Sequence, residues 1–121
     1  KPDQDLWNTP LTKSGNMNAK KIAHHVYFTL EDAAQQRVES LLEDMRKYLD
    51  SHAGLEHFSC GTLNAELDRP VNDRNFHVSL HTVFENRTAH DAYQADPRHA
   101  EFIQRNQSNW KQVRVFDSDV D

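Results

Sequence analysis

Residues 92–99, AYQADPRH, gather three side chains that can transfer or hold protons. Tyr93 offers a phenol, Asp96 a carboxylate and His99 an imidazole, and Pro97 interrupts the surrounding helical pattern. A broken helix leaves backbone groups free and often borders a cavity. Tyr93 and His99 are therefore candidate catalytic residues that could act as a general acid and base. The alternative is that both only cap and pack the helix.

His24 is a second candidate, because it falls on an apolar strand face. It alternates with residues such as Val26 and Phe28, which we expect to face the core. A buried neutral imidazole needs two hydrogen-bond partners. His24 is therefore either a core histidine tied to backbone or tyrosine, or part of a pocket floor.

Other histidines fall on the opposite face of the strands. His25, His77 and His81 share it with Tyr27, Ser79, Arg114 and Phe116. This mixture is too polar for a monomer core and too aromatic for open solvent, so it suits a wet subunit interface. His77 and His81 would lie roughly 13 Å apart, too far to share a metal ion directly. Nearer ligands could come from His25 or a partner subunit, but we predict no metal site. The remaining histidines are expected at the surface: His52, His57 and His90.

Composition excludes several classes of protein. The 121 residues suit one domain, with 36% hydrophobic residues, mean hydropathy −0.90, eight histidines and a net charge of −5. No apolar run is long enough for a membrane span, and no basic block indicates nucleic acid. Cys60 is the single cysteine, so an internal disulfide and CxxC metal sites are impossible. The low apolar fraction favours folding with a second subunit.

Hydrophobic periodicity predicts the order β-α-β-β-α-β. Strands are expected at 21–30, 55–66, 75–85 and 111–118, and helices at 31–52, 87–95 and 98–109, with a turn at 67–74. Gly54 is a candidate stop for the first helix. Residues 1–19 lack periodicity and are expected to form an N-terminal tail before a domain at 20–121. The order is typical of a ferredoxin-like α+β fold with a four-stranded antiparallel sheet. Both helical segments should cover one face, opposite apolar strand residues: Phe76, Val78, Leu80, Val113 and Val115.

The strand AHHVYFTL, the segment AGLEHFSCG, the run FHVSLHTVFENRTAHDAYQADPRHAEFI and the final VRVFD occur in a specific succession. Within it, Phe84-Glu85 precedes Tyr93-x-x-x-Pro97-x-His99. Over residues 21–118 the chain thereby resembles the stress-responsive A/B barrel (Dabb) family. The resemblance implies a homodimer whose two sheets face each other in an α/β barrel. Many bacterial members have no assigned activity.

The resemblance to the polyketide cyclase branch of that family also implies a pocket between helices and sheet. Tyr93 and His99 match its acid–base pair, His24 a pocket-lining histidine and Trp110 an aromatic wall residue. Asp96 departs from that branch, which has histidine before the proline, and so puts the same substrate in doubt. Residues expected to line the pocket are His24, Val26, Phe28, Leu80, Asp96, Phe102 and Trp110.

Three functions are compatible with the sequence. The first is a homodimeric Dabb-domain protein with a small-molecule pocket and no specific reaction. The second is an enzyme in which His99 is the base and Tyr93 polarises the carbonyl of a keto substrate. The third is a monooxygenase of the antibiotic-biosynthesis class, which shares the dimeric barrel. We expect no cofactor, no nucleic acid and no membrane partner, and a cytoplasmic location unless a signal peptide was removed before Lys1.

Overall fold

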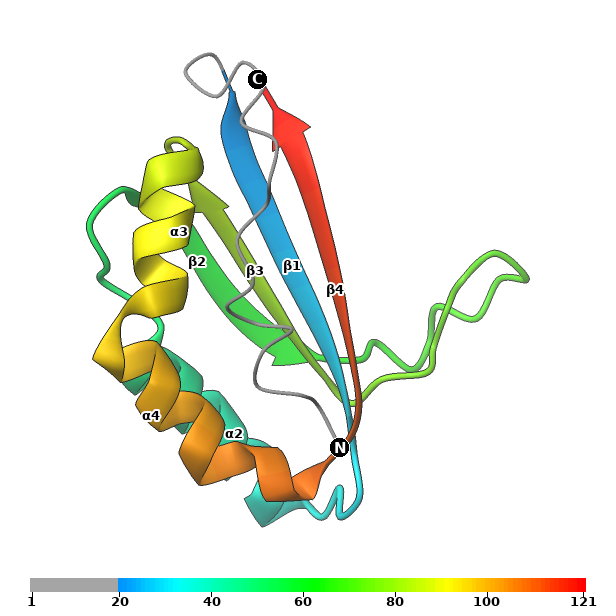
Figure 1. The fold of residues 1–121 in the computed structure, drawn as a ribbon. Coiled ribbons are helices and arrows are strands. Elements are labelled where there is room, and N and C mark those ends of the chain that lie inside the picture. The colour runs from blue at the N-terminus through cyan, green and yellow to red at the C-terminus, as the bar shows by residue number, and fades with distance from the viewer. Residues whose placement is uncertain (1–19) are drawn as a thin grey trace.

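The computed structural model describes residues 20–121, which form one four-stranded antiparallel sheet covered by helices on one face (Figure 1). The expected tail at 1–19 lies outside the described residues. The strands are β1 (Lys21–Leu30), β2 (Leu55–Thr62), β3 (Val78–Phe84) and β4 (Trp110–Val120). The helices are α2 (Gln35–Tyr48), α3 (Arg87–Ala95), α4 (Pro97–Asn106) and the 3₁₀ helix η1 (Gln107–Asn109). None of these helices is long and apolar enough to cross a membrane.

The strand order β2-β3-β1-β4 confirms the predicted ferredoxin-like arrangement. β1 is central and pairs antiparallel with both β3 and β4. Its residues alternate between the two faces, and Val26 and Phe28 on the helix side are each 1% exposed. The core between sheet and helices is therefore built largely on this strand. Val115 pairs with Val26 and so faces the helix side, but it is 42% exposed because β4 is an edge strand.

The connection between β2 and β3 is longer than the sequence predicted. The expected strand at 55–66 ends at Thr62, and the expected strand at 75–85 begins only at Val78. Residues 63–77 form a loop that extends away from the sheet (Figure 1). The prediction that Phe76 faces the helices is wrong, because its ring lies 5.0 Å from the ring of Tyr27 on the opposite face.

The first helix is shorter than the predicted range of 31–52. Asp32 is held in a turn, since its N–H donates to Asn109 Oδ1 and its carboxylate accepts the N–H of Ala34. The helix begins after that turn and ends at Tyr48, so Gly54 is not its stop signal. Gly54 has a φ of +80°, and a Cβ there would clash with the Cβ of Ala89 in α3. Gly54 therefore lets the start of β2 pack directly against α3.

The predicted break in the second helical segment is confirmed at Asp96. The Asp96 carboxylate accepts the N–H of Arg98 and caps α4, while Pro97 occupies the first helical position, where its missing N–H costs nothing. α3 has its own cap, because the side chain of Asn86 accepts the N–H of Ala89. Two short capped helices can each turn a buried side chain toward the sheet, Tyr93 from α3 and His99 from α4.

Candidate functional site

Tyr93 lies at the centre of a cluster of rings between α3 and the sheet. Its side chain is 2% exposed, and its ring centroid is 4.8 Å from that of His99, 5.0 Å from His52 and 6.0 Å from His24. Phe84 of β3 packs against it at 4.8 Å. The four neighbours come from β1, β3, α4 and the connection after α2. The fold therefore brings one phenol and three imidazoles together from distant parts of the sequence.

The hydroxyl of Tyr93 is buried and has no hydrogen-bond partner among residues 20–121. Burial raises the pKa of Tyr93, so the phenol stays protonated at physiological pH. An unpaired buried hydroxyl costs roughly 1–3 kcal/mol of stability. Within the described part of the chain, the hydroxyl is therefore a buried donor whose missing partner reduces stability.

His99 is 3% exposed and lies on the α4 side of the Tyr93 ring. Burial, reinforced by the nearby imidazoles of His24, His52 and His90, lowers the pKa of His99 to about 3. The imidazole is therefore neutral near pH 7. Neutral imidazole can accept a proton or a hydrogen bond, but a pKa this low makes it a weak base in the free protein.

His52 was expected at the surface, and the structure shows that this was wrong. Its side chain is 5% exposed and its ring packs edge-on against Tyr93. The Nε2–H donates to the Tyr48 carbonyl at 2.8 Å, which leaves Nδ1 as an acceptor in the neutral ring. Asp96 Oδ2 lies 3.9 Å from that Nδ1. His52 follows α2 in an irregular segment, so no periodic pattern in the sequence indicated its burial.

His24 is 3% exposed and bonded to a carboxylate, neither to backbone nor to tyrosine through its ring. Its Nδ1 lies 2.6 Å from Asp117 Oδ1, across the pairing of β1 with β4. Burial alone would raise the pKa of Asp117, but the hydrogen bond and the charge of His24 hold it below its usual value. The carboxylate is thus ionised at neutral pH beside the imidazole. Sequence reasoning placed His24 correctly on the helix side and missed its partner.

His90 is the other histidine wrongly expected at the surface. Its side chain is 15% exposed, and its ring lies 5.1 Å from that of His24. The Nδ1 lies 3.0 Å from Asp91 Oδ1, whereas Nε2 is buried without a hydrogen-bond partner among the described residues. A usable signal did exist, because His90 precedes Tyr93 by three positions and so shares its helix face.

The residues predicted to line one pocket fall into two groups. His24 and Asp96 lie near Tyr93, whereas Trp110 pairs with Leu30 at the far end of β1. Leu30 lies six positions after His24 on β1, a distance of roughly 20 Å. The space between His24 and Leu30 on the helix side of the sheet is filled by buried core residues, which include Val26, Phe28, Leu80 and Phe102. Trp110 is therefore not a wall of the Tyr93 site.

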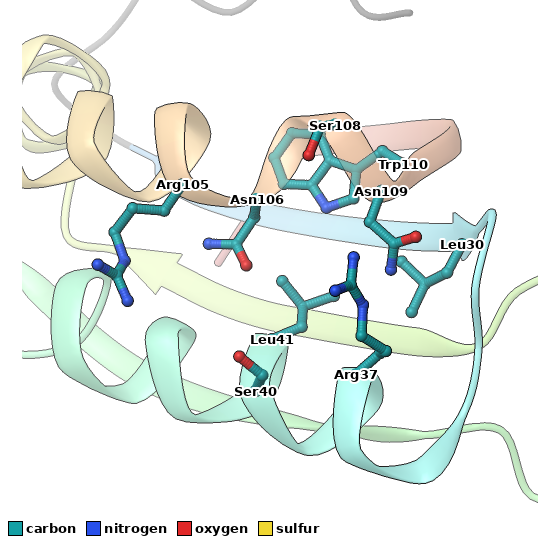
Figure 2. A pocket seen from close by; sticks show the side chains of 9 residues that line it. All are labelled: Leu30, Arg37, Ser40, Leu41, Arg105, Asn106, Ser108, Asn109 and Trp110. Carbon is teal, nitrogen blue, oxygen red and sulfur yellow. The ribbon is translucent and has the colours of Figure 1, made fainter.

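A small pocket does adjoin Trp110, at the end of the helices away from Tyr93 (Figure 2). It has a volume of about 110 Å³, and the side chains that line it come from β1, α2, α4, η1 and β4: Leu30, Arg37, Ser40, Leu41, Arg105, Asn106, Ser108, Asn109 and Trp110. Ligand pockets usually measure about 300–1,000 Å³. This pocket is too small to hold a typical organic ligand.

The open face of the sheet carries the residues predicted to form an interface. The rings of His25 and His81 lie 4.8 Å apart, and Tyr27 contacts His81 at 5.9 Å and Phe116 at 5.8 Å. Phe116 is 52% exposed. His77 does not join this group by any ring contact, and its Nδ1 accepts the N–H of Leu30 within the same chain.

The sequence profile described as the Stress responsive A/B Barrel Domain (Dabb) matches residues 22–120. The chain belongs to the Dabb family. The match spans all four strands and the three α-helices, so the Tyr93 cluster and the open face both lie inside the Dabb domain. No curated protein matches the sequence.

Solved structures with the same fold include proteins with and without a known activity. A Dabb family protein with a ferredoxin-like fold from Mesorhizobium loti is 25% identical, with a TM-score of 0.68 over 82% of this chain and 95% of that one. A dimeric ferredoxin-like protein of unknown function from Thermobifida fusca is 14% identical, with a TM-score of 0.70 over 91% and 100% of the two chains. Hydroxynitrile lyase from Passiflora edulis is 15% identical, with a TM-score of 0.68 over 84% and 94%. At such identities the last two show the Dabb-like fold alone.

Proposed function

We propose that this chain is a homodimeric Dabb-domain protein that binds a small uncharged molecule at Tyr93. The observation that carries the proposal is the buried Tyr93 hydroxyl, which has no hydrogen-bond partner among residues 20–121. A protonated phenol donates a hydrogen bond, so the ligand should present an acceptor oxygen such as a carbonyl. The adjoining imidazole of His99 is neutral and buried, which disfavours a cationic ligand and suits an uncharged one.

The homodimer is proposed from the open face of the sheet. Phe116 of β4 is 52% exposed, and aromatic and imidazole rings gather beside it on this face. Structural relatives from Thermobifida fusca and Jannaschia are described as dimeric. Sedimentation of the full chain at micromolar concentration should give the mass of two chains. A monomer at that concentration would contradict the proposal.

A second candidate is an enzyme that uses Tyr93 and His99 for proton transfer at a carbonyl compound. The 4.8 Å separation of their rings favours it, since one substrate could touch both groups. The fold carries a lyase activity in the Passiflora edulis protein. We place it second because a base with a pKa of about 3 removes protons poorly at pH 7.

Titration with a panel of aromatic and keto-acid compounds tests the binding function. Each compound is titrated into wild-type protein and into the Tyr93→Phe and Tyr48→Phe variants. A ligand at the Tyr93 site should bind Tyr93→Phe about tenfold more weakly, because one hydrogen bond worth roughly 1.4 kcal/mol is lost. Tyr48→Phe should bind as tightly as wild type. Equal affinity for all three proteins would place the ligand elsewhere and contradict the proposal.

Turnover of a bound compound distinguishes the two functions. Ligands that bind are incubated with the wild-type protein, and the mixture is analysed by mass spectrometry and proton exchange at the carbon beside the carbonyl. Exchange or product that disappears in His99→Gln would establish the enzyme. Binding without exchange or product would make Tyr93 part of a ligand-binding site and not of an active site.

A further inference from the structure

Three side chains from separate elements of the fold meet beside Tyr93. His24 comes from β1, His90 from α3 and Asp117 from β4, and one possible ligand atom from each lies within 4.8 Å of the others. We propose that His24, His90 and Asp117 form a binding site for a divalent transition-metal ion of the zinc type. Neither the sequence pattern nor the proposed ligand function requires this site.

His90 gives the strongest support for the proposal. Its Nε2 is buried and has no hydrogen-bond partner within residues 20–121, although a buried polar atom normally finds one. The other ring nitrogen lies 3.0 Å from the carboxylate of Asp91, which can only accept. Nδ1 therefore carries the proton, and Nε2 presents a lone pair. A lone pair without a donor is what a metal ligand needs before the ion arrives.

The hydrogen bonds that hold the His90 ring also resemble those in known metal sites. Histidines that bind metals usually donate their second ring N–H to a carboxylate, which fixes the ring and increases its basicity. Asp91 supplies that carboxylate and is held in turn by Arg87 Nε at 2.9 Å, four positions earlier on α3. Asp91 is thus a positioning residue, and the arginine neutralises its charge.

The geometry requires only side-chain adjustment. Around tetrahedral zinc, ligand atoms about 2.0–2.2 Å from the ion lie roughly 3.4 Å from one another. His24 Nδ1 and Asp117 Oδ1, now 2.6 Å apart, would separate as the ion takes the place of the proton that Nδ1 donates, and the neutral ring would then carry its proton at Nε2. The widest pair would close from within 4.8 Å. The pairs that include His90 are the ones that must close, since His24 and Asp117 already lie together.

The donor set selects the class of ion. Two imidazoles and one carboxylate suit zinc and similar transition metals, whereas magnesium and calcium prefer oxygen ligands. Three protein ligands leave a fourth position for water or for an atom of a small molecule. Within residues 20–121 no other three such side chains come together, and the paired histidines of the open face, His25 and His81, lack a third ligand.

Metal titration tests the site without any organic ligand. Full-length protein without an affinity tag is stripped with EDTA, dialysed and titrated with Co²⁺, whose visible absorption reports tetrahedral coordination, and with Zn²⁺ by calorimetry. The variants are His90→Gln, Asp117→Asn and Asp91→Asn. His57→Gln is the matched control, because His57 is an exposed histidine outside the cluster.

We expect one ion per chain in wild type and in His57→Gln. His90→Gln and Asp117→Asn should lose saturable binding, and Asp91→Asn should bind roughly 10- to 100-fold more weakly. Binding that survives His90→Gln or Asp117→Asn, or a wild type that binds no ion, would overturn the site. Unchanged affinity in Asp91→Asn would overturn its positioning role.

A measurement on the wild type keeps the proposal testable should a variant fail to fold. Imidazole ¹⁵N spectra are recorded with and without one equivalent of Zn²⁺. The Nε2 resonance of His90 should move on metal addition, and that of His57 should not. Resonances of His90 that stay fixed while zinc binds would place the ion elsewhere.

Discussion

Removing the Tyr93 hydroxyl should make the protein more stable. The oxygen is buried and unpaired within the described part of the chain, and such a group costs roughly 1–3 kcal/mol. Tyr93→Phe keeps the ring that packs against Phe84 and His99 at 4.8 Å. The substitution therefore deletes the cost and keeps the packing. We expect the free energy of unfolding to rise by about 1 kcal/mol, which raises Tm by about 3–5 °C for a domain of this size.

Urea and thermal denaturation of wild type, Tyr93→Phe and Tyr48→Phe measure the effect. Tyr48 is only partly buried, so its hydroxyl is a control, and its removal should change stability by no more than about 0.5 kcal/mol. The protein is studied at fixed concentration, because the proposed dimerisation would add to apparent stability. A loss of 1 kcal/mol or more in Tyr93→Phe would show that the hydroxyl is hydrogen-bonded, and would refute the argument that it is reserved for a ligand.

Three further predictions concern packing and pH. Gly54→Ala should destabilise the protein by more than about 1 kcal/mol in urea denaturation, because its φ is positive and the added Cβ would clash with Ala89. Because burial lowers the pKa of His99 to about 3, unfolding takes up a proton below pH 6.5. The free energy of unfolding should then fall by up to about 1.4 kcal/mol per pH unit between about pH 6 and 4, and His99→Gln should flatten that slope. Burial, and then neighbouring histidine charge, lowers the pKa of His25 and of His81, whose Nδ1 atoms lie 3.3 Å apart. Because both pKa values lie below 6.5, protonation should weaken the proposed dimer as the pH falls from about 6.5 to 4.5, and sedimentation that is unchanged over this range would contradict it.

The fold could be predicted because its elements carry strong local patterns. Apolar residues alternate along β1 and recur about every 3.6 residues along α2. These local patterns identify each element as a strand or a helix and show which of its faces packs against the core. Asp96-Pro97 also specifies its own break, since the residue before proline disfavours helix. The missed boundaries depend on distant partners. The start of α2 is set by Asn109, which lies 77 positions from Asp32, and no local pattern reports such a contact.

The candidate site was predicted only in part, for a related reason. Tyr93 and His99 stand in a motif, so they could be identified from spacing. The burial of His52 comes from packing of an irregular segment against α3, and the partner of His24 comes from the register of β1 with β4. The same register places Trp110 opposite Leu30, far from the site with which the resemblance had grouped it.

The alternation of side chains along β1 explains how the chain places polar clusters on both faces of its sheet. Neighbours on β1 point to opposite faces, so His24 enters the cluster with Asp117 while His25 meets His81 on the open side. Moving β1 by one residue would put one of these histidines in the place of the other and give the remaining place to Ala23 or Val26, so one of the two arrangements would lose its histidine. Core packing of Val26 on the same strand opposes such a shift. A small hydrophobic core can therefore hold two polar sites in place, because one rigid central strand positions a side chain for each.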